Sequence, residues 1–204
     1  LLLIMAIRVR TNVALAPYTT FGIGGRARYF ISVADSAGLV RAVGLAREKN
    51  WPYYLIAGGS NVVFDDKTFQ GLVIHYQIKN QGSTLKTHQG RTLIIKCEAG
   101  IFLSRLIKTA ISNGLAGLET LSGIPGTVGG AIVGNAGAYG QTISDCLTRI
   151  DIFDSKLLDA ARPMGRAASG IRWLTKKQCQ FTYSDSVFKQ KKGVGWIILR
   201  AEFK

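Results

Sequence analysis

Glycine is concentrated in three groups along this chain, and that clustering restricts the folds open to it more than any other feature of the sequence. Glycine makes up 24 of the 204 residues, whereas its usual share is about 7%. The groups span residues 22–25, 58–59 and 123–140. The last reads GIPGTVGGAIVGNAGAYG, with seven glycines in eighteen residues. Aliphatic residues are interleaved with these glycines, so the segment is neither low-complexity sequence nor a flexible linker.

The segment 123–140 has the composition of backbone that lies against a large, flat ligand. Each missing Cβ lets the main chain approach a ring or a phosphate. Thr127, Asn135 and Tyr139 can supply the few polar contacts. The alternative is a glycine-rich segment that is packed where two subdomains meet. Both interpretations stay open at this point.

A second candidate for ligand contact is Ala57-Gly-Gly-Ser-Asn61, which directly follows an apolar run. Two adjacent glycines let consecutive backbone N–H groups turn toward one point and form an anion-binding concavity. Ser60 and Asn61 can add side-chain donors to a phosphate oxygen. A tight turn between strands favours the same residue types, so this alternative also stays open.

The first glycine group belongs to Gly22-Ile-Gly-Gly-Arg-Ala27, which matches the G-x-G-x-x-A dinucleotide fingerprint. That fingerprint binds pyrophosphate only where a strand precedes it and a helix follows. Here residues 15–20 do not have the pattern of a strand, and residues 29–33 have the pattern of one. We therefore interpret the match as coincidental.

Short strands and short helices alternate along the rest of the chain. A helix is expected after Asp35 or Ser36, because apolar residues then recur at helical spacing until Pro52 ends it. A second helix is expected to stop at Asn113-Gly114, and a short one lies at 175–179. The pattern is mixed α/β, with a subdomain break expected within 80–91. Strands are predicted at 29–33, 53–57, 71–75, 93–99, 147–153 and 196–203, and the second helix has Leu103, Leu106, Ile107, Ala110 and Ile111 on one face.

The charge balance is strongly basic. Lys and Arg outnumber Asp and Glu by 26 to 12, a formal net charge of +14. Such a field favours nucleic acid, anionic lipid or phosphate-bearing cofactors and substrates. The basic residues are dispersed and lack the interleaved aromatic residues of a stacking platform, so we expect no nucleic-acid partner. No stretch approaches the roughly 20 apolar residues of a membrane span, and we expect no membrane partner.

Cysteine and histidine spacing gives no indication of a metal site. Cys97, Cys146 and Cys179 are 49 and 33 residues apart and form no CxxC pair. This usage argues against zinc and for a reducing compartment, the cytoplasm. His75 and His88 have no cysteine or carboxylate at ligand spacing, so we expect no bound metal.

Six stretches together carry a pattern that none of them carries alone. They are Thr19-Thr-Phe-Gly-Ile-Gly-Gly25, Ala57-Gly-Gly-Ser-Asn61, Gly117-Leu-Glu119, GIPGTVGG at 123–130, Asn135-Ala-Gly-Ala-Tyr-Gly140 and Cys179-Gln-Phe-Thr-Tyr-Ser-Asp-Ser-Val-Phe-Lys189. Their order and spacing resemble a flavoenzyme family of peptidoglycan synthesis, UDP-N-acetylenolpyruvoylglucosamine reductase, also called UDP-N-acetylmuramate dehydrogenase. The resemblance covers nearly the whole chain.

The resemblance implies an α+β, two-subdomain FAD-binding fold of the PCMH/vanillyl-alcohol-oxidase type, with mixed sheets and flanking short helices. Residues 1–80 would form the first FAD-binding subdomain and residues 81–204 the second, with FAD held between them. The loop of Gly58, Gly59, Ser60 and Asn61 would contact the pyrophosphate, and the segment 123–140 would line the adenosine, ribityl and isoalloxazine groups. The implied cofactor contacts in that segment are Gly123, Ile124, Pro125, Gly126, Thr127, Gly129, Gly130, Asn135, Gly137, Ala138, Tyr139 and Gly140.

In such enzymes NADPH reduces the flavin, and hydride then passes to the enolpyruvyl double bond of a UDP-sugar. The resemblance therefore implies FAD as cofactor, NADPH as hydride donor, a UDP-sugar enolpyruvyl ether as substrate and a monomeric, cytoplasmic enzyme. FAD carries the hydride chemistry, while the protein orients the substrate and stabilises the developing enolate charge.

Two departures from the family pattern concern catalysis. After Cys179 the family reads Tyr-Arg-x-Ser, and its arginine engages the substrate carboxylate. Here Ser184 follows Tyr183 in that place, and one neutral hydroxyl replaces five charged donors. Such a loss would cost on the order of 100–1,000-fold in rate.

The second departure is that the family continues into a substrate-binding domain with a serine proton donor and a late glutamate, beyond the position of Lys204. We therefore predict that this chain binds FAD but has little or no reductase activity alone. One alternative is a flavin-binding module that has lost the reaction and serves another end. Another, which the dispersed basic residues disfavour, is a basic nucleic-acid-binding domain.

Overall fold

The computed structural model describes residues 8–78, 83–88, 92–157 and 170–204. Within these residues the chain forms two compact units, of which the first ends at Gln77 and the second begins at Ile78. The expected subdomain boundary lies between residues 80 and 81, a few residues later. None of the described helices is long and apolar enough to cross a membrane.

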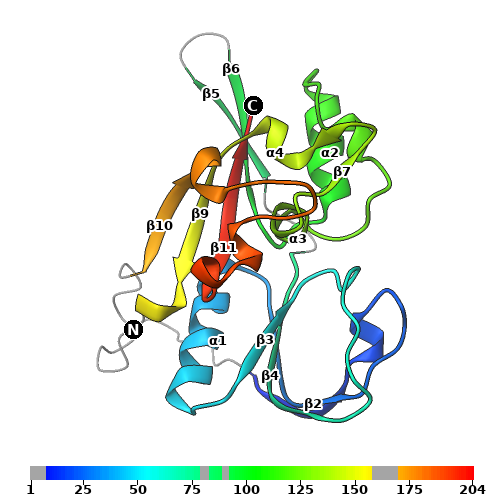
Figure 1. Ribbon diagram of the computed structural model, residues 1–204, viewed down its shortest axis with the longest axis vertical. Helices are drawn as coiled ribbons and strands as arrows, with labels where there is room; N and C mark the ends of the chain where they lie inside the picture. Colours follow the sequence, from blue (N-terminus) through cyan, green and yellow to red (C-terminus); the bar gives the residue numbers. More distant parts are fainter. Residues whose placement is uncertain (1–7, 79–82, 89–91, 158–169) are drawn as a thin grey trace. The chain divides into compact units, whose positions relative to one another are not determined.

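The first unit is built on a four-stranded sheet with the order β1-β2-β4-β3 (Figure 1). Strand β1 (Arg10–Ala14) is antiparallel to β2 (Arg26–Val33), whereas β4 (Phe69–Tyr76) runs parallel to both β2 and β3 (Tyr53–Ile56). Residues 71–74 of β4 are all buried. Such a continuous buried run is typical of a parallel strand that is covered on both faces.

Helix α1 (Ser36–Glu48) begins where the sequence predicts it. The Asp35 carboxylate caps the helix and accepts a hydrogen bond of 2.6 Å from the backbone N–H of Gly38, which satisfies one of the unpaired donors of the first turn. The apolar face of α1, which includes the buried Leu39 and Val43, packs against β2 and β4. Asn50, just beyond the helix, has a φ of +53°, a conformation that ends a helix.

Two loops cover the other face of this sheet. Phe30 on β2 pairs with Val73 on β4, and the two side chains form a cluster of buried residues with Leu15 and Ile56. The neighbouring pair in the ladder has its side chains on the opposite face, because side chains alternate along a strand. The covering loops span residues 15–25, which include the short helix η1 (Ala16–Tyr18), and residues 57–66. The sheet thus has a helix on one face and irregular chain on the other.

The second unit is built on a five-stranded antiparallel sheet with the order β10-β9-β11-β6-β5 (Figure 1). Its remaining elements are short, and several are single turns of 3-10 helix. The strands are β5 (Ser83–His88), β6 (Thr92–Glu98), β9 (Leu147–Asp154), β10 (Ile171–Thr175) and β11 (Trp196–Phe203), with a small hairpin of β7 (Gly137–Ala138) and β8 (Gln141–Thr142). The helices are α2 (Leu103–Ser112), α3 (Val128–Val133), α4 (Ile143–Cys146), η2 (Glu119–Leu121), η3 (Ser155–Leu157), η4 (Lys176–Cys179), η5 (Val187–Lys189) and η6 (Lys191–Gly193).

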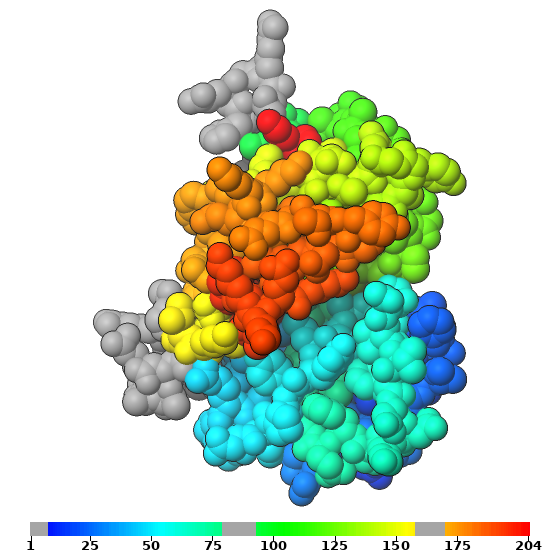
Figure 2. All heavy atoms as spheres, viewed as in Figure 1, coloured from blue at the N-terminus to red at the C-terminus, as the bar shows by residue number. Residues whose placement is uncertain are grey.

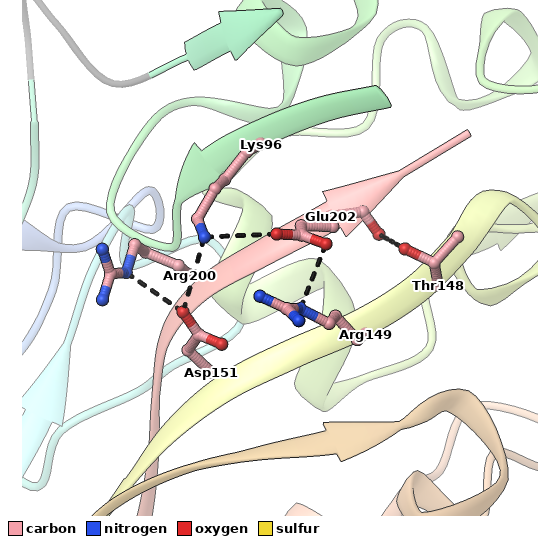
Figure 3. A network of polar contacts seen from close by, with 6 residues as sticks. All are labelled: Lys96, Thr148, Arg149, Asp151, Arg200 and Glu202. Atoms are coloured by element: carbon pink, nitrogen blue, oxygen red, sulfur yellow. Dashed lines mark hydrogen bonds and ion pairs between the residues drawn. The ribbon is translucent and has the colours of Figure 1, made fainter. Parts of the chain in front are cut away.

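Ion pairs cross one face of this sheet and connect its three central strands (Figure 3). Lys96 on β6 lies 3.2 Å from Glu202 and 3.9 Å from Asp151. Arg149 pairs with Glu202 at 3.1 Å, and Arg200 pairs with Asp151 at 3.3 Å. Both carboxylates are therefore held by two cations each, as cross-strand pairs that stabilise a sheet. In the described part of the chain, no group of three or more His, Cys, Asp or Glu side chains could hold a metal ion.

The elements predicted from apolar runs and caps agree with the structure, apart from shifts of a few residues at their ends. Residues 83–88, within the expected break, instead form β5. The prediction for Ile111 was wrong, because its side chain is 55% exposed while the rest of the predicted α2 face is buried. The sequence pattern did not predict β1, β10 or α3: the two strands are edge strands with largely exposed residues, and α3 contains two adjacent glycines, which are poor helix formers.

Candidate cofactor site

The loop after β3 contains a glycine that no other residue could replace without strain. Gly59 is buried with a φ of +64°, and a Cβ there would overlap the carbonyl oxygen of Tyr18. The backbone N–H of Thr20 donates to the carbonyl of Gly59 at 3.0 Å. Gly59 is therefore needed for the packing of two loops. Gly58 and Ser60 are half-buried, and Asn61 is exposed.

The segment 123–140 divides into a turn, the short helix α3 and the β7–β8 hairpin. Some of its glycines serve packing inside the unit. Gly129 donates its N–H to the carbonyl of Ala99 at 2.8 Å, and a Cβ at Gly129 would lie 2.9 Å from the Ala99 Cβ. At Gly137 a Cβ would lie 2.7 Å from the carbonyl of Gln141. These positions explain part of the glycine content without a ligand.

Two other glycines of the segment have no packing reason to lack a side chain. Gly123 and Gly140 have φ values of +90° and +82°, and an added Cβ at either would meet no atom within 4 Å. Their backbone is exposed. Open space above glycine backbone is the geometry that allows a ligand to lie directly on the main chain.

The three polar residues predicted in this segment have very different surroundings. Thr127 is 1% exposed and caps α3, since its hydroxyl accepts from the N–H of Gly130 at 3.4 Å. Its hydroxyl therefore already has a structural role. Tyr139 is 93% exposed at the end of the small hairpin, with a φ of +52°.

Asn135 is the polar side chain whose surroundings most clearly call for a ligand. It is 6% exposed, and its amide Nδ2 donates to the carbonyl of Thr182 at 2.9 Å. Its Oδ1 is buried and has no hydrogen-bond partner among the residues that the structure describes. A buried acceptor left unpaired costs about 1–3 kcal/mol, so a donor from outside the chain would stabilise this site.

The segment after Cys179 places Tyr183 and Ser184 at the tip of a tight turn. Thr182 and Asp185 are bonded in both directions, N–H to carbonyl, at 3.1 and 3.3 Å. Tyr183 is 96% exposed, and Ser184 has a φ of +51°. Figure 2 shows the orange segment that contains this turn on the surface of the second unit. The two residues predicted to be catalytic are therefore freely accessible.

Two contacts that the sequence did not predict hold this turn. Ser186 is fully buried, and its hydroxyl donates to the carbonyl of Val133 at 2.7 Å. Lys189 donates to the carbonyl of Ser184 at 2.6 Å. Ser186 stands at the serine of the family pattern Tyr-Arg-x-Ser, so the pattern marks this position but does not indicate its contact with Val133. The structure thus joins the end of α3 to the turn that carries Tyr183 and Ser184.

The pKa values of all three cysteines are raised. Burial raises the pKa of Cys179 to about 12, and burial together with Glu98 raises the pKa of Cys97 to about 12. Burial also raises the pKa of Cys146, with Asp145 and Glu119 adding to the effect. Since the thiolate is the reactive form, the buried Cys97 and Cys179 are poor nucleophiles, and the partly buried Cys146 is the most accessible of the three.

Comparison with known proteins points to one cofactor. The family model described as an FAD-binding domain matches residues 27–156. UDP-N-acetylenolpyruvoylglucosamine reductase from Solibacter usitatus is 38% identical over 194 residues, which are 95% of this chain and 55% of that protein. The protein of the same name from Pseudomonas putida is 34% identical over 199 residues, 98% of this chain and 54% of its own length. This chain spans about half the length of these curated relatives.

Solved structures give the same result. The crystal structure of UDP-N-acetylenolpyruvylglucosamine reductase from Thermus caldophilus aligns with a TM-score of 0.70 at 29% identity, covering 98% of this chain and 62% of that one. A single-residue variant of cholesterol oxidase from Brevibacterium sterolicum aligns with a TM-score of 0.63 at 12% identity, covering 97% of this chain and 37% of that one. The second likeness shows a shared fold alone. Together these matches confirm the predicted fold class.

Proposed function

Since the chain belongs to the family of FAD-binding domains and is homologous over nearly its whole length to UDP-N-acetylenolpyruvoylglucosamine reductases, we propose that it binds FAD through the loop 58–61 and the segment 123–140. The resemblance to this enzyme family predicted from the motifs is confirmed by these matches. The two segments belong to different units of the chain, and we propose a different group of FAD as the contact of each.

The single observation that carries the proposal is the unpaired Oδ1 of Asn135. A buried acceptor in a glycine-rich segment fits a ligand that has donors, and FAD has several on its ribityl chain and rings. The open backbone at Gly123 and Gly140 fits the same ligand, because flat rings can contact it directly. In the first unit, Ser60 and the backbone N–H groups of the loop would hold phosphate oxygens. The described residues therefore fit FAD.

The reaction that we propose for the whole protein is the reduction of a UDP-sugar enolpyruvyl ether with NADPH, a step of peptidoglycan synthesis. FAD, held by the loop 58–61 and the segment 123–140, would supply the hydride chemistry between NADPH and the double bond of the enolpyruvyl group. The chain's part is to hold the cofactor and to present Tyr183 and Ser184 to the substrate. The net charge of +14 suits three phosphate-bearing ligands.

A second candidate is a flavin-binding module without reductase activity, and Ser184 is the observation in its favour. A neutral hydroxyl at the tip of the turn gives weak stabilisation to a developing enolate, compared with a charged guanidinium. The variant Ser184→Arg distinguishes the two candidates. Introduced into the complete gene product, it should raise turnover if Ser184 has weakened a reductase, and it should change nothing if the protein is a module that has lost the reaction.

We place the protein in the cytoplasm and expect a monomer. Its three cysteines are all free in the structure, which is the usual state of cysteines in a reducing compartment.

The test of the proposal is reconstitution. The purified chain is incubated with FAD, freed of excess cofactor and examined for the visible absorbance bands of bound flavin. NADPH is then added without oxygen, with and without the UDP-sugar substrate. Bound flavin supports the proposal, and its absence after reconstitution rejects it. Bleaching by NADPH followed by substrate-dependent recovery of the flavin bands assigns the reductase reaction to this chain, whereas bleaching without recovery assigns it the cofactor half alone.

A further inference from the structure

The two polar atoms of the Asn135 side-chain amide differ in their hydrogen bonding. Its Nδ2 holds the carbonyl of Thr182 at 2.9 Å, while its Oδ1 is buried without a partner among the described residues. The orientation follows from chemistry, because a carbonyl oxygen accepts only from a donor and the NH₂ group must face Thr182. In this orientation the amide satisfies the turn and leaves its own acceptor unsatisfied.

This conflict makes the contact to Thr182 dependent on what faces Oδ1. When no donor faces Oδ1, the amide gains the free energy of a hydrogen bond by rotating toward solvent or any other donor. This rotation breaks the bond from Nδ2 to Thr182. A ligand donor at Oδ1 removes that gain. The ligand therefore favours the orientation in which the turn is held, which is a shift in population between two side-chain states.

We propose that Asn135 is a positioning residue that couples occupancy of the cofactor site to the position of the turn 182–185. The inference rests on the proposed function, since FAD is the ligand whose donor would face Oδ1. It goes beyond that function because it assigns the turn a response to the cofactor. Tyr183 and Ser184 at the tip would be held more firmly when the cofactor is bound than when it is absent.

A second anchor lets the coupling be tested separately from the stability of the turn. The hydroxyl of Ser186 donates to the carbonyl of Val133 at 2.7 Å. This bond holds the turn next to α3 whether or not a ligand is present. Loss of Ser186 should loosen the turn in both states, whereas loss of Asn135 should remove the difference between the states.

The experiment measures amide hydrogen exchange of the 204-residue chain with and without saturating FAD. The reporters are the N–H groups of Thr182 and Asp185, which are bonded across the turn. FAD should slow their exchange by about 10-fold or more, because exchange requires opening of the turn. The chosen variant is Asn135→Gly, since Asn135 has a φ of +43° and glycine adopts that conformation without strain.

In Asn135→Gly, the two amides should exchange at the same rate without FAD and at saturating FAD. FAD should bind this variant about 3- to 15-fold more weakly than it binds the wild type, the loss expected for one hydrogen bond. In Ser186→Ala both amides should exchange faster, and the effect of FAD should persist. If FAD binds to the wild type without slowing these amides, or slows them equally in Asn135→Gly, the coupling is rejected while FAD binding stands. If the wild type binds no FAD, both the proposed function and the coupling are rejected.

Discussion

The hydroxyl of Ser186 and the carbonyl of Val133, 53 positions apart in the sequence, are joined by a hydrogen bond of 2.7 Å inside the second unit. The contact ties the glycine-rich segment to the turn that carries Tyr183 and Ser184. Because Ser186 is fully buried, its hydroxyl has no water to replace this acceptor. The bond is therefore a structural link between the proposed cofactor segment and the proposed catalytic tip.

Removal of this hydroxyl should destabilise the chain. We expect Ser186→Ala to lower the free energy of unfolding by about 1–2 kcal/mol, because the Val133 carbonyl loses its partner in a buried place. Urea denaturation measures the change. The matched control is Ser112→Ala, whose exposed hydroxyl donates to the carbonyl of Thr109 and accepts from the side chain of the adjacent Asn113, and which should change stability by less than about 0.5 kcal/mol. Equal effects of the two variants would show that the link contributes nothing.

A comparison of Gly59 with Gly22 separates the stability cost of a left-handed backbone conformation from the cost of a steric overlap. Their φ values are +64° and +67°, but a Cβ at Gly59 would overlap the Tyr18 carbonyl, whereas at Gly22 it would meet nothing within 4 Å. Gly22→Ala should cost about 1 kcal/mol for the left-handed conformation. Gly59→Ala should cost about 1–3 kcal/mol more because of the overlap. Thermal or urea unfolding of both variants gives the difference, and similar losses at the two positions would contradict the packing described for Gly59.

Gly123 and Gly140 should affect the cofactor more than the fold. Gly123→Ala and Gly140→Ala place a methyl group in open space, so each should cost only about 1–2 kcal/mol of stability through its positive φ. If FAD lies on this backbone, each should weaken FAD binding about 10-fold or more, since the methyl group would occupy the ligand's place. Titration with FAD measures the affinity. Gly114→Ala is the control, since Gly114 has a φ of +69° and open space in the same unit, and it should leave the affinity unchanged.

Acid should weaken the second unit through two carboxylates. Hydrogen bonds from the backbone N–H groups of Glu119 itself and of Gly117 lower the pKa of Glu119 below its ordinary value of 4.5. A hydrogen bond from the N–H of Thr142 lowers the pKa of Asp145 below 3.8. A carboxylate with a lowered pKa in the folded state stabilises the fold above its ordinary pKa, and this contribution is lost as the pH falls through the lowered value.

Stability should therefore decline as the pH falls from about 5 toward 3, and the decline should be smaller in the double variant Glu119→Gln, Asp145→Asn. Urea denaturation over this pH range provides the measurement. An unchanged slope in the double variant would show that these carboxylates are not linked to folding.

Thiol reactivity should distinguish the three cysteines. With their pKa raised to about 12, Cys97 and Cys179 remain almost entirely protonated at pH 8, and both are buried. Cys146 is only partly buried. A thiol reagent should therefore modify Cys146 first and the other two only after denaturation. Cys146→Ser should abolish the fast phase, and a fast phase that survives in this variant would contradict the burial of the other two.

Much of the fold is readable from local chemistry. The carboxylate of Asp35 and the spacing of apolar residues after it predict α1, because a cap and an apolar stripe depend on residues close together in the chain. Similarly, the coincidental nature of the G-x-G-x-x-A match is confirmed, since Arg26 and Ala27 begin β2, and a strand rather than a helix therefore directly follows the glycines. The edge strand β10 was not predicted because its exposed residues do not alternate with buried ones.

The clustering of glycine is a property of the sequence by itself, because it depends only on residue identity and spacing. The sequence alone therefore indicated the family and the cofactor class. Which glycines serve packing and which leave open backbone was decided only by the tertiary structure. A Cβ added at Gly59 would overlap Tyr18, and one added at Gly129 would lie against Ala99. A Cβ added at Gly123 or Gly140 would meet no atom within 4 Å. The same holds for Asn135, whose unpaired oxygen is defined by the burial around it and by its bond to Thr182, 47 positions away. Contacts between residues that are remote along the chain arise only when the chain folds, so no local pattern records them.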